Sequence, residues 1–307
     1  MDPLVFVLVA GAAVLHVTWN VLLKTAGDPL RAAAVGMATA TAVICPAALV
    51  GWLAIGRPAV GGDTIALSVV SGALEALYFA FLAAAYRRGD LSLVYPLARG
   101  SAPLLAVGIG VVVLNERLGA LGFAGVAALI IGILALQRPW RYLRAAGRES
   151  GGAAGFALLT GITIASYSAV DRVGVRGTEP WIYAGLIWAS CTVFLWAYVW
   201  VYRRRAAAAL AGTAETGAGS GTSDAPAFSS RRAGIGGLLT LAAYLLILVA
   251  FSVAPLTAVA PLRESAIVLA SGWGAFRLRE AVDRADAFRR IGAAGIVLIG
   301  ALLLAID

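Results

Sequence analysis

The chain has 307 residues, of which 61% are hydrophobic, only 13% are charged and 36 are glycine, and its mean hydropathy is +0.89. This composition excludes a soluble globular domain and indicates an integral membrane protein. The net charge of +8 at pH 7 does not indicate a nucleic-acid partner, because the basic residues form short clusters between apolar runs, where they set the orientation in the membrane.

Apolar runs follow one another along the whole chain. A helix needs about 20 apolar residues to cross a bilayer core. On this criterion we predict ten spans, at residues 4–24, 32–55, 65–86, 91–114, 120–136, 152–172, 181–202, 233–251, 256–276 and 289–305. The sequence therefore predicts an all-α integral membrane protein with ten transmembrane helices. The first run lacks a basic leading segment and a small-residue cleavage site, so we interpret it as a mature helix and not a signal peptide.

The connections between these spans are mostly short, so consecutive helices should be antiparallel neighbours. The exception is 203–232, which is bounded by arginines and rich in Ala, Gly, Ser and Thr. Such a composition does not build a core, and we predict a flexible loop without chemistry.

The chain also contains an internal repeat. Aligning Pro96 with Pro261 brings Glu116 within one residue of Glu280. Separately, the Thr-Trp-Asn run of the first span lines up with the Ser-Tyr-Ser run of the sixth. We therefore predict two five-helix repeats, at residues 1–145 and 151–307. Because five is odd, the second repeat enters the membrane from the opposite side, and such inverted repeats let a bundle open to either side in turn. The alternative is that two antiparallel copies only pack well.

The basic residues are distributed unevenly. Most of the 24 Lys and Arg lie in the connections that follow the odd-numbered spans. The positive-inside rule then predicts that both termini lie outside the cytoplasm.

Three stretches of sequence resemble a known family. They are HVTWNVLLK in the first span, YRRGDLSLVYPLARGSAPLL, and LNERLGALGFAGVAALIIGILAL, followed by a degenerate second copy. Over essentially the whole chain except 203–232, they resemble the EamA-like group of the drug/metabolite transporter superfamily. The resemblance implies a multi-pass secondary transporter of the cell (inner) membrane, commonly an exporter of amino acids, other metabolites or drugs driven by proton exchange or a substrate gradient. Members are usually drawn with cytoplasmic termini, so the charge bias departs from the family pattern.

Few ionisable residues lie well inside the predicted spans. Charge inside a membrane span is expensive and by default indicates a functional site. Helical spacing adds polar neighbours on the same faces, and one tryptophan is a candidate for the cavity. The candidates for the substrate or proton pathway are Glu75, Arg99, Glu264, Arg263, His16, Asn20, Tyr78, Tyr95 and Trp19.

These residues suggest distinct roles. We expect Arg99 to bind a substrate carboxylate, and Glu75 or Glu264 to hold an amine or the coupling proton, because apolar surroundings favour the neutral form of a carboxyl group. The alternative is that the arginines only neutralise the acids. For His16, a packing role is the alternative to a proton relay.

Two prolines and two glutamates lie at notable positions. Pro96 and Pro261 follow several residues of their spans, so we expect them to kink the helices beside the cavity and to serve in gating, unless the helices begin at these prolines. Glu116 and Glu280, at span ends, are expected to form caps or ion pairs between the two halves.

The sequence thus predicts a secondary active transporter that works by alternating access and exports amino acids or related zwitterions with proton coupling. The balance of two Glu and two Arg inside the spans favours a zwitterion. The alternatives are a multidrug or cationic-compound exporter and, with less support, a channel. The chain lacks catalytic and metal-binding motifs, so no enzyme activity, metal or cofactor is expected. The expected partners are the lipid bilayer, a small-molecule substrate and protons, and the expected state is a monomer or weak homo-oligomer.

Overall fold

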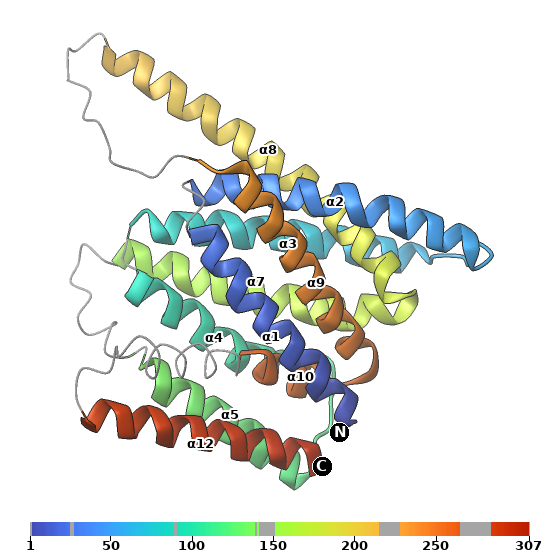
Figure 1. Ribbon diagram of the computed structural model, residues 1–307, viewed down its shortest axis with the longest axis vertical. Coiled ribbons are helices and arrows are strands. Elements are labelled where there is room, and N and C mark those ends of the chain that lie inside the picture. The colour runs from blue at the N-terminus through green and yellow to red at the C-terminus, as the bar shows by residue number, and fades with distance from the viewer. Residues whose placement is uncertain are drawn as a thin grey trace.

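The structure is a computed structural model, and it describes residues 2–24, 28–88, 91–138, 140, 151–214, 228–264 and 284–306. All the regular structure of these residues is helical, which confirms the predicted all-α class. The helices are α1 (Pro3–Lys24), α2 (Pro29–Ala54), α3 (Gly62–Tyr86), α4 (Leu91–Val112), α5 (Ala120–Gln137), α7 (Gly151–Gly174), α8 (Pro180–Ala214), α9 (Ser230–Val253), α10 (Leu256–Glu264) and α12 (Arg284–Ile306), with a single 3-10 turn, η2 (Val175–Gly177). They form one layered bundle (Figure 1).

Most helices begin and end within a few residues of the predicted spans. The clear difference is α8, which continues to Ala214, so the first part of the predicted loop 203–232 is helical. The physical reason is the run RRRAAAALAG, because alanine and arginine have high intrinsic helix propensity and need no packing partner to extend a helix. The second half of the ninth predicted span, beyond Glu264, lies outside the described residues.

Local capping fixes where α2 begins and how the chain turns after it. The side chain of Asp28 accepts hydrogen bonds from the backbone N–H groups of Leu30 at 3.0 Å and Arg31 at 3.2 Å, and Pro29 occupies the first turn, where its missing donor costs nothing. After α2, Gly56 and Arg57 adopt positive φ values of 87° and 59°. This left-handed pair reverses the chain into α3.

Several helices have the length and surface of membrane spans. Among the described residues, five helices are long and apolar enough to cross a bilayer, at Pro29–Ala54, Gly62–Tyr86, Gly152–Gly177, Pro180–Arg205 and Ser230–Val253. Large apolar side chains also face outward, such as Val50, Val193 and Leu298, each more than 60% exposed. A soluble protein does not leave so much apolar surface in water. These are the features of an α-helical membrane protein.

The helices pack in a pattern that encloses a centre. Helix α3 packs against α7 and α8, α1 against α9, α2 against α8 and α9, and α4 against α7 and α10. The main core between them contains the fully buried Trp188, Tyr183 and Phe251. Helices α5 and α12 pair with each other at one edge (Figure 1) and share a smaller core with Leu129, Ile133 and Val297.

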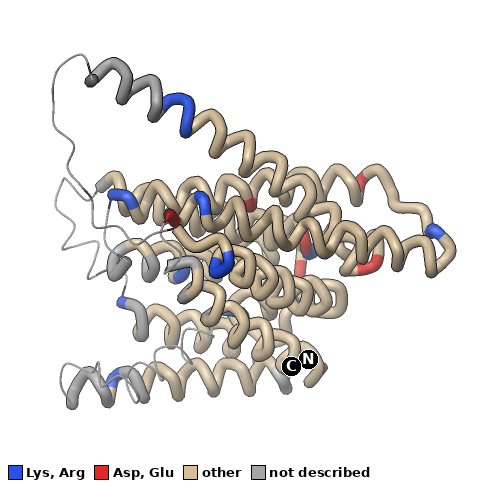
Figure 2. Tube along the Cα trace, turned by 45° about the horizontal axis from the view of Figure 1, so that its top comes forward, with Lys and Arg blue, Asp and Glu red and all other residues tan. Residues whose placement is uncertain are grey.

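The two ends of the bundle differ in charge. Helix α1 begins and α12 ends at the same end (Figure 1). Most of the described Lys and Arg residues lie toward the opposite end (Figure 2). This opposite end, where Arg31, Arg87 and Arg203 line one cavity, is called the basic end below.

Candidate functional site

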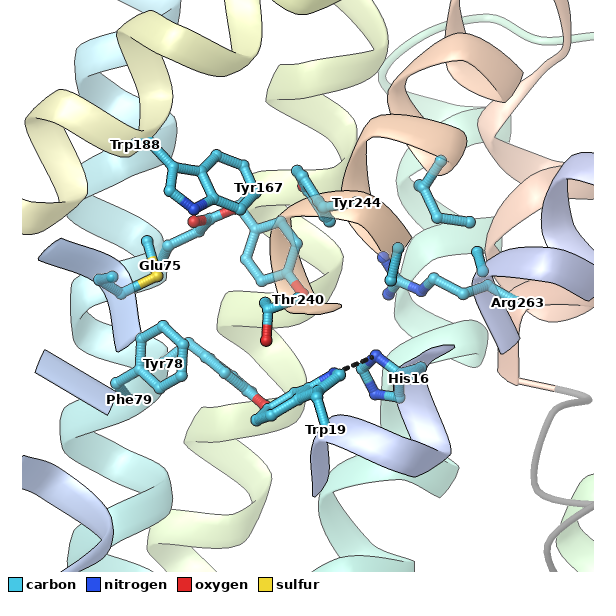
Figure 3. A pocket seen from close by; sticks show the side chains of 14 residues that line it. His16, Trp19, Glu75, Tyr78, Phe79, Tyr167, Trp188, Thr240, Tyr244 and Arg263 are labelled. Carbon is cyan, nitrogen blue, oxygen red and sulfur yellow. Dashed lines mark hydrogen bonds between the residues drawn. The ribbon is translucent and has the colours of Figure 1, made fainter. Parts of the chain in front are cut away.

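A small cavity lies at the centre of the bundle. Its walls come from α1, α2 and α3 in the first half of the chain and from α7, α8, α9 and α10 in the second. Ten of its side chains are labelled in Figure 3: His16, Trp19, Glu75, Tyr78, Phe79, Tyr167, Trp188, Thr240, Tyr244 and Arg263. The cavity therefore combines apolar rings with a few ionisable groups.

One wall of the cavity is basic. The guanidinium group of Arg99 forms a short hydrogen bond with Nε2 of His16, and the indole N–H of Trp19 donates to Nδ1 of the same ring at 3.0 Å. A neutral imidazole accepts at one nitrogen only, whereas arginine and tryptophan side chains only donate. His16 therefore lies between two donor side chains, one at each of its ring nitrogens.

Arg263 belongs to the same side of the cavity (Figure 3). It extends from α10, donates to the hydroxyl group of Ser168 at 3.3 Å and lies 6.0 Å from the ring centre of Tyr167. Both arginines are nearly buried, with 6% of Arg99 and 7% of Arg263 exposed. Two guanidinium groups thus lie at the centre of an apolar bundle.

The opposite side of the cavity is acidic. Glu75 lies on α3 beside Trp188 (Figure 3), and its carboxyl group interacts electrostatically with Asp171 and Arg263. Asp171, on α7, is fully buried. It accepts hydrogen bonds from the hydroxyl groups of Tyr183, at 3.2 Å, and Tyr244. Since Tyr244 also lines the cavity, it connects Asp171 to the cavity surface.

Aromatic rings form most of the remaining wall. Tyr167 lies between Tyr78 and Tyr244, with ring-centre distances of 6.2 and 6.0 Å, and Trp188 lies 5.3 Å from Tyr244. The indole nitrogen of Trp188 is buried and has no hydrogen-bond partner among the described residues. A buried donor without an acceptor is costly, so a bound molecule with an acceptor atom would be stabilised at this position.

The structure brings together a large part of the predicted set. His16, Trp19, Glu75, Tyr78 and Arg263 line the central cavity. Arg99 contacts His16 from outside the central cavity and, with Tyr78, lines a smaller adjoining cavity. The side chains of Asn20, Tyr95, Pro96 and Glu264 lie outside the described part of the chain, as does the whole of Glu280.

The two prolines lie inside helices. Helix α4 begins at Leu91 and α10 at Leu256, so positions 96 and 261 both fall well past the first residue. The alternative in which the helices begin at the prolines is therefore wrong. A role in gating remains a prediction.

Sequence reasoning missed several residues of the site, above all Asp171. Asp171 precedes Arg172 near the predicted end of its span, where a charged pair suggests an interfacial position. The prediction named only two acids and two arginines well inside the spans; Asp171, near the end of α7, is a further acid that is completely buried in the bundle. One feature of the sequence could have identified Asp171: it follows Tyr167 by four residues, so the two lie on one face of the helix.

A second, smaller cavity adjoins the central one on the side of the basic end. It shares Trp19, Met37, Phe79 and Thr240 with the central cavity and is also lined by Arg232. In its wall, α2 and α9 cross so closely that a Cβ atom on Gly237 would lie 2.5 Å from the Cα atom of Gly36. The two helices approach this closely because both facing residues are glycine and have no side chain.

Glu116 joins the two halves of the chain at the end opposite the basic one. Its carboxylate oxygens accept hydrogen bonds from the backbone N–H groups of Leu256 at 2.7 Å and Thr257 at 2.9 Å, which are the first two residues of α10. It also forms an ion pair with Arg172 at 3.5 Å. Glu116, from the first half of the chain, thus caps α10 and pairs with Arg172, both of which belong to the second half. Glu116 is not among the described residues that line the central cavity.

Comparisons with known proteins identify the fold alone. No family model and no curated protein matches the chain. A solved structure described as "Crystal structure of protein" has a TM-score of 0.67 and 17% sequence identity, over 98% of this chain and 97% of that chain. The chain therefore shares a known fold over nearly its full length.

Proposed function

We propose that this protein is a secondary active transporter of small metabolites that works by alternating access. The observation that carries the proposal is the central cavity, in which Glu75 and Arg263 approach from opposite sides (Figure 3) and to which both halves of the chain contribute. A polar cavity near the middle of a membrane bundle, between two halves, is the usual position of a transporter's substrate site.

Two inverted five-helix repeats are part of this proposal. Suppose that α1 to α5 correspond in order to α7, α8, α9, α10 and α12. The counterpart of the contact between α1 and α9 is then the contact between α7 and α3, and both are present. The counterpart of the contact between α2 and α9 is the contact between α8 and α3, and both are present as well. The pairs α2 with α8, α4 with α10 and α5 with α12 each map onto themselves. A set of contacts that is unchanged by this exchange supports a twofold relation between the halves.

The α5 and α12 pair supports the same relation in atomic detail. A Cβ atom on Gly125 would meet the carbonyl oxygen of Gly300 and the backbone nitrogen of Leu304. A Cβ atom on Gly300 would meet the carbonyl oxygen of Gly125 and the backbone nitrogen of Leu129. Each glycine thus meets its counterpart and the residue four positions further on, as a local twofold axis requires.

For the substrate, we propose an amino acid or a related zwitterion, which the protein exports. The donors around His16, together with Arg263, would hold a carboxylate, and Glu75 on the opposite side would hold an amine. The aromatic lining supports a second candidate, a hydrophobic cation, since such ligands bind over aromatic rings and Asp171 adds a second acid. A multidrug exporter is therefore the alternative.

We assign the coupling proton to Glu75, with Asp171 and Tyr244 as its neighbours. Carboxyl groups in a low-dielectric site exchange between charged and neutral forms according to what else is bound. A proton on Glu75 and a substrate amine beside it would then exclude each other, which couples the two fluxes.

The family and the cellular setting belong to the same proposal. The resemblance to the EamA-like transporters fits a ten-span protein of the cell (inner) membrane. The position of the basic end favours a cytoplasmic location for it, with both termini outside.

Transport by reconstituted protein tests the proposal. A thermal-shift screen of metabolites identifies a ligand, because a molecule that binds only the folded protein raises its melting temperature. Counterflow of that ligand in proteoliposomes then separates the classes. We expect uptake to be stimulated by substrate inside the vesicles, as for a carrier. Uptake that ignores the internal substrate would indicate a channel and contradict the proposal.

A further inference from the structure

A further cavity opens at the basic end, between the beginning of α2, the end of α3 and α8. Its polar lining consists of Asp28, Arg31, Tyr86, Arg87, Tyr202 and Arg203. We propose that this basic cavity binds the phosphate group of an anionic molecule, supplied by a phospholipid headgroup or by free phosphate. The proposal does not depend on transport.

The three arginines come from three different helices. Arg31 lies in the first turn of α2, Arg87 directly follows α3, and Arg203 lies on α8, yet all three line one cavity. Guanidinium groups bind phosphate oxygens through paired N–H donors. Because the three arginines come from separate helices, they surround a concave site. A run of basic residues along one exposed helix would not.

Stacking holds two of these arginines in place. The guanidinium carbon of Arg31 lies 4.0 Å from the ring centre of Phe228, and that of Arg87 lies 4.9 Å from the ring centre of Tyr202. A guanidinium group stacked on a ring keeps its edge N–H groups available for an anion. Less conformational entropy is then lost when a phosphate binds.

The one acid in the lining, Asp28, has another role. Its side chain accepts hydrogen bonds from the backbone N–H groups of Leu30 and Arg31 as the cap of α2. The described lining therefore has three cationic side chains against one carboxylate, which favours an anion of more than one negative oxygen.

The position of the cavity suits a lipid. It lies where α2 begins and α3 ends. The ends of membrane-spanning helices are where lipid headgroups are expected, and tyrosines such as Tyr86 and Tyr202 are typical of that region. Its inner wall is apolar, with the buried residues Leu30, Ala83 and Val199. Basic pockets between membrane helices on the cytoplasmic side bind anionic headgroups. Phosphate oxygens would contact the arginines while the glycerol and first methylenes lie against the apolar wall.

The chain offers a matched control of equal charge. Arg88 follows Arg87, but it donates to the carbonyl oxygen of Ala84 at 3.0 Å and lies 4.6 Å from the ring centre of Phe156. Arg204 follows Arg203, but it lies 3.7 Å from the ring centre of Trp200. Neither neighbour lines the basic cavity. The double variants R87Q/R203Q and R88Q/R204Q thus remove the same charge from adjacent positions.

Lipid binding by the purified full-length protein tests the proposal. Native mass spectrometry measures retention of phosphatidylglycerol and of phosphatidylcholine in neutral detergent, and a thermal-shift titration with each lipid and with inorganic phosphate gives apparent affinities. We expect wild type and R88Q/R204Q to prefer phosphatidylglycerol. We expect R87Q/R203Q to bind it roughly 30-fold more weakly, from the usual attraction of an anionic headgroup to two arginines.

Each outcome decides the matter. If inorganic phosphate stabilises wild type but not R87Q/R203Q and displaces the lipid, the site takes free phosphate. If phosphatidylglycerol stabilises wild type but not R87Q/R203Q, and inorganic phosphate has no effect, the basic cavity binds a lipid headgroup. An equal loss in both double variants, or no preference for the anionic lipid in wild type, overturns the proposal. The single variant R203Q changes an exposed side chain and gives the same test without risk to folding.

Discussion

Glu75 is the residue on which the proposed coupling depends most. Replacing Glu75 with Gln keeps the size of the side chain and removes its ability to release a proton. We expect Glu75→Gln to abolish uptake driven by a pH gradient in proteoliposomes, while the protein still elutes from size-exclusion chromatography as folded protein. Glu179→Gln, at an exposed position before α8, is the matched control. Full pH-driven uptake by Glu75→Gln would remove Glu75 from the mechanism.

Asp171 makes a different prediction, on stability. Asp171→Ala leaves the hydroxyl groups of Tyr183 and Tyr244 without their acceptor, and an unsatisfied buried hydroxyl costs about 1–3 kcal/mol. We expect the free energy of unfolding to fall by about 2–4 kcal/mol, measured by thermal unfolding in detergent. Asp171→Asn keeps an acceptor oxygen and should cost less. Asp63→Ala, in the exposed first turn of α3, controls for loss of an acid, and an equal shift in this control would contradict the argument.

The candidate residues that were easiest to identify from the sequence are those with a clear apolar background. Glu75 and Arg263 interrupt long apolar runs, so their charges are conspicuous, and both line the central cavity. Asp171 is adjacent to Arg172, and sequence alone does not tell whether such a pair lies in the membrane interface or inside. The structure separates the two: Arg172 pairs with Glu116, whereas Asp171 turns inward to two tyrosines. Tertiary contacts decide such cases.

At the scale of helices, the cap that Glu116 provides joins the halves. Glu116→Ala removes the acceptor for two N–H groups of α10, and loss of a cap costs about 1–2 kcal/mol, with a further cost for the partly buried Arg172. We expect a lower melting temperature in detergent. Arg117→Ala, at the exposed next position, should change it little. If both variants melt alike, the cap contributes nothing to stability.

The crossing of α2 and α9 gives a prediction about glycine. Gly237→Ala places a methyl group against the backbone of Gly36, so the helices are forced apart, and we expect a loss of several degrees in melting temperature and slower transport. Gly155→Ala introduces a methyl group with nothing within 4 Å, and alanine in a helix is more stable than glycine by about 1 kcal/mol. That variant should be neutral or more stable. Equal effects of the two substitutions would show that the crossing tolerates a side chain.

The bounds of most helices were predicted to within a few residues, because apolar runs of about 20 residues mark where helices begin and end. Helix α5 (Ala120–Gln137), for example, differs from its predicted span of 120–136 by a single residue. The extension of α8 to Ala214 was not predicted, since span length gives no information on a helix that continues past the apolar region. There, alanine-rich propensity decides.

For the whole molecule, the distribution of charge predicts the orientation. In a variant without Cys45 and Cys191, a single cysteine at Pro58, in the exposed turn between α2 and α3, should react with a membrane-impermeant reagent applied to intact cells. A single cysteine at Arg204, at the basic end, should react only after the membrane is permeabilised. The reverse pattern would place both termini in the cytoplasm, as the family is usually drawn.

The relation between the two halves was predicted from the sequence as an inverted repeat, and it stays a proposal. The prolines at 96 and 261 suggest a repeat, but many pairs of helices have similar apolar composition, and sequence alone does not say which helices touch. The spatial evidence for a twofold relation comes from the exchange of helix contacts and from Gly125 and Gly300, which lie 175 positions apart in the chain.

The contact between Gly36 and Gly237 also bears on the speed of a transport cycle. Where two backbones touch, no rotamer change can separate them, so α2 and α9 move apart at this point only as rigid rods. Such collective displacements take microseconds to milliseconds. Bilayer thickness and temperature act on entire helices, and they should therefore govern turnover more strongly than the chemistry of any single neighbouring side chain.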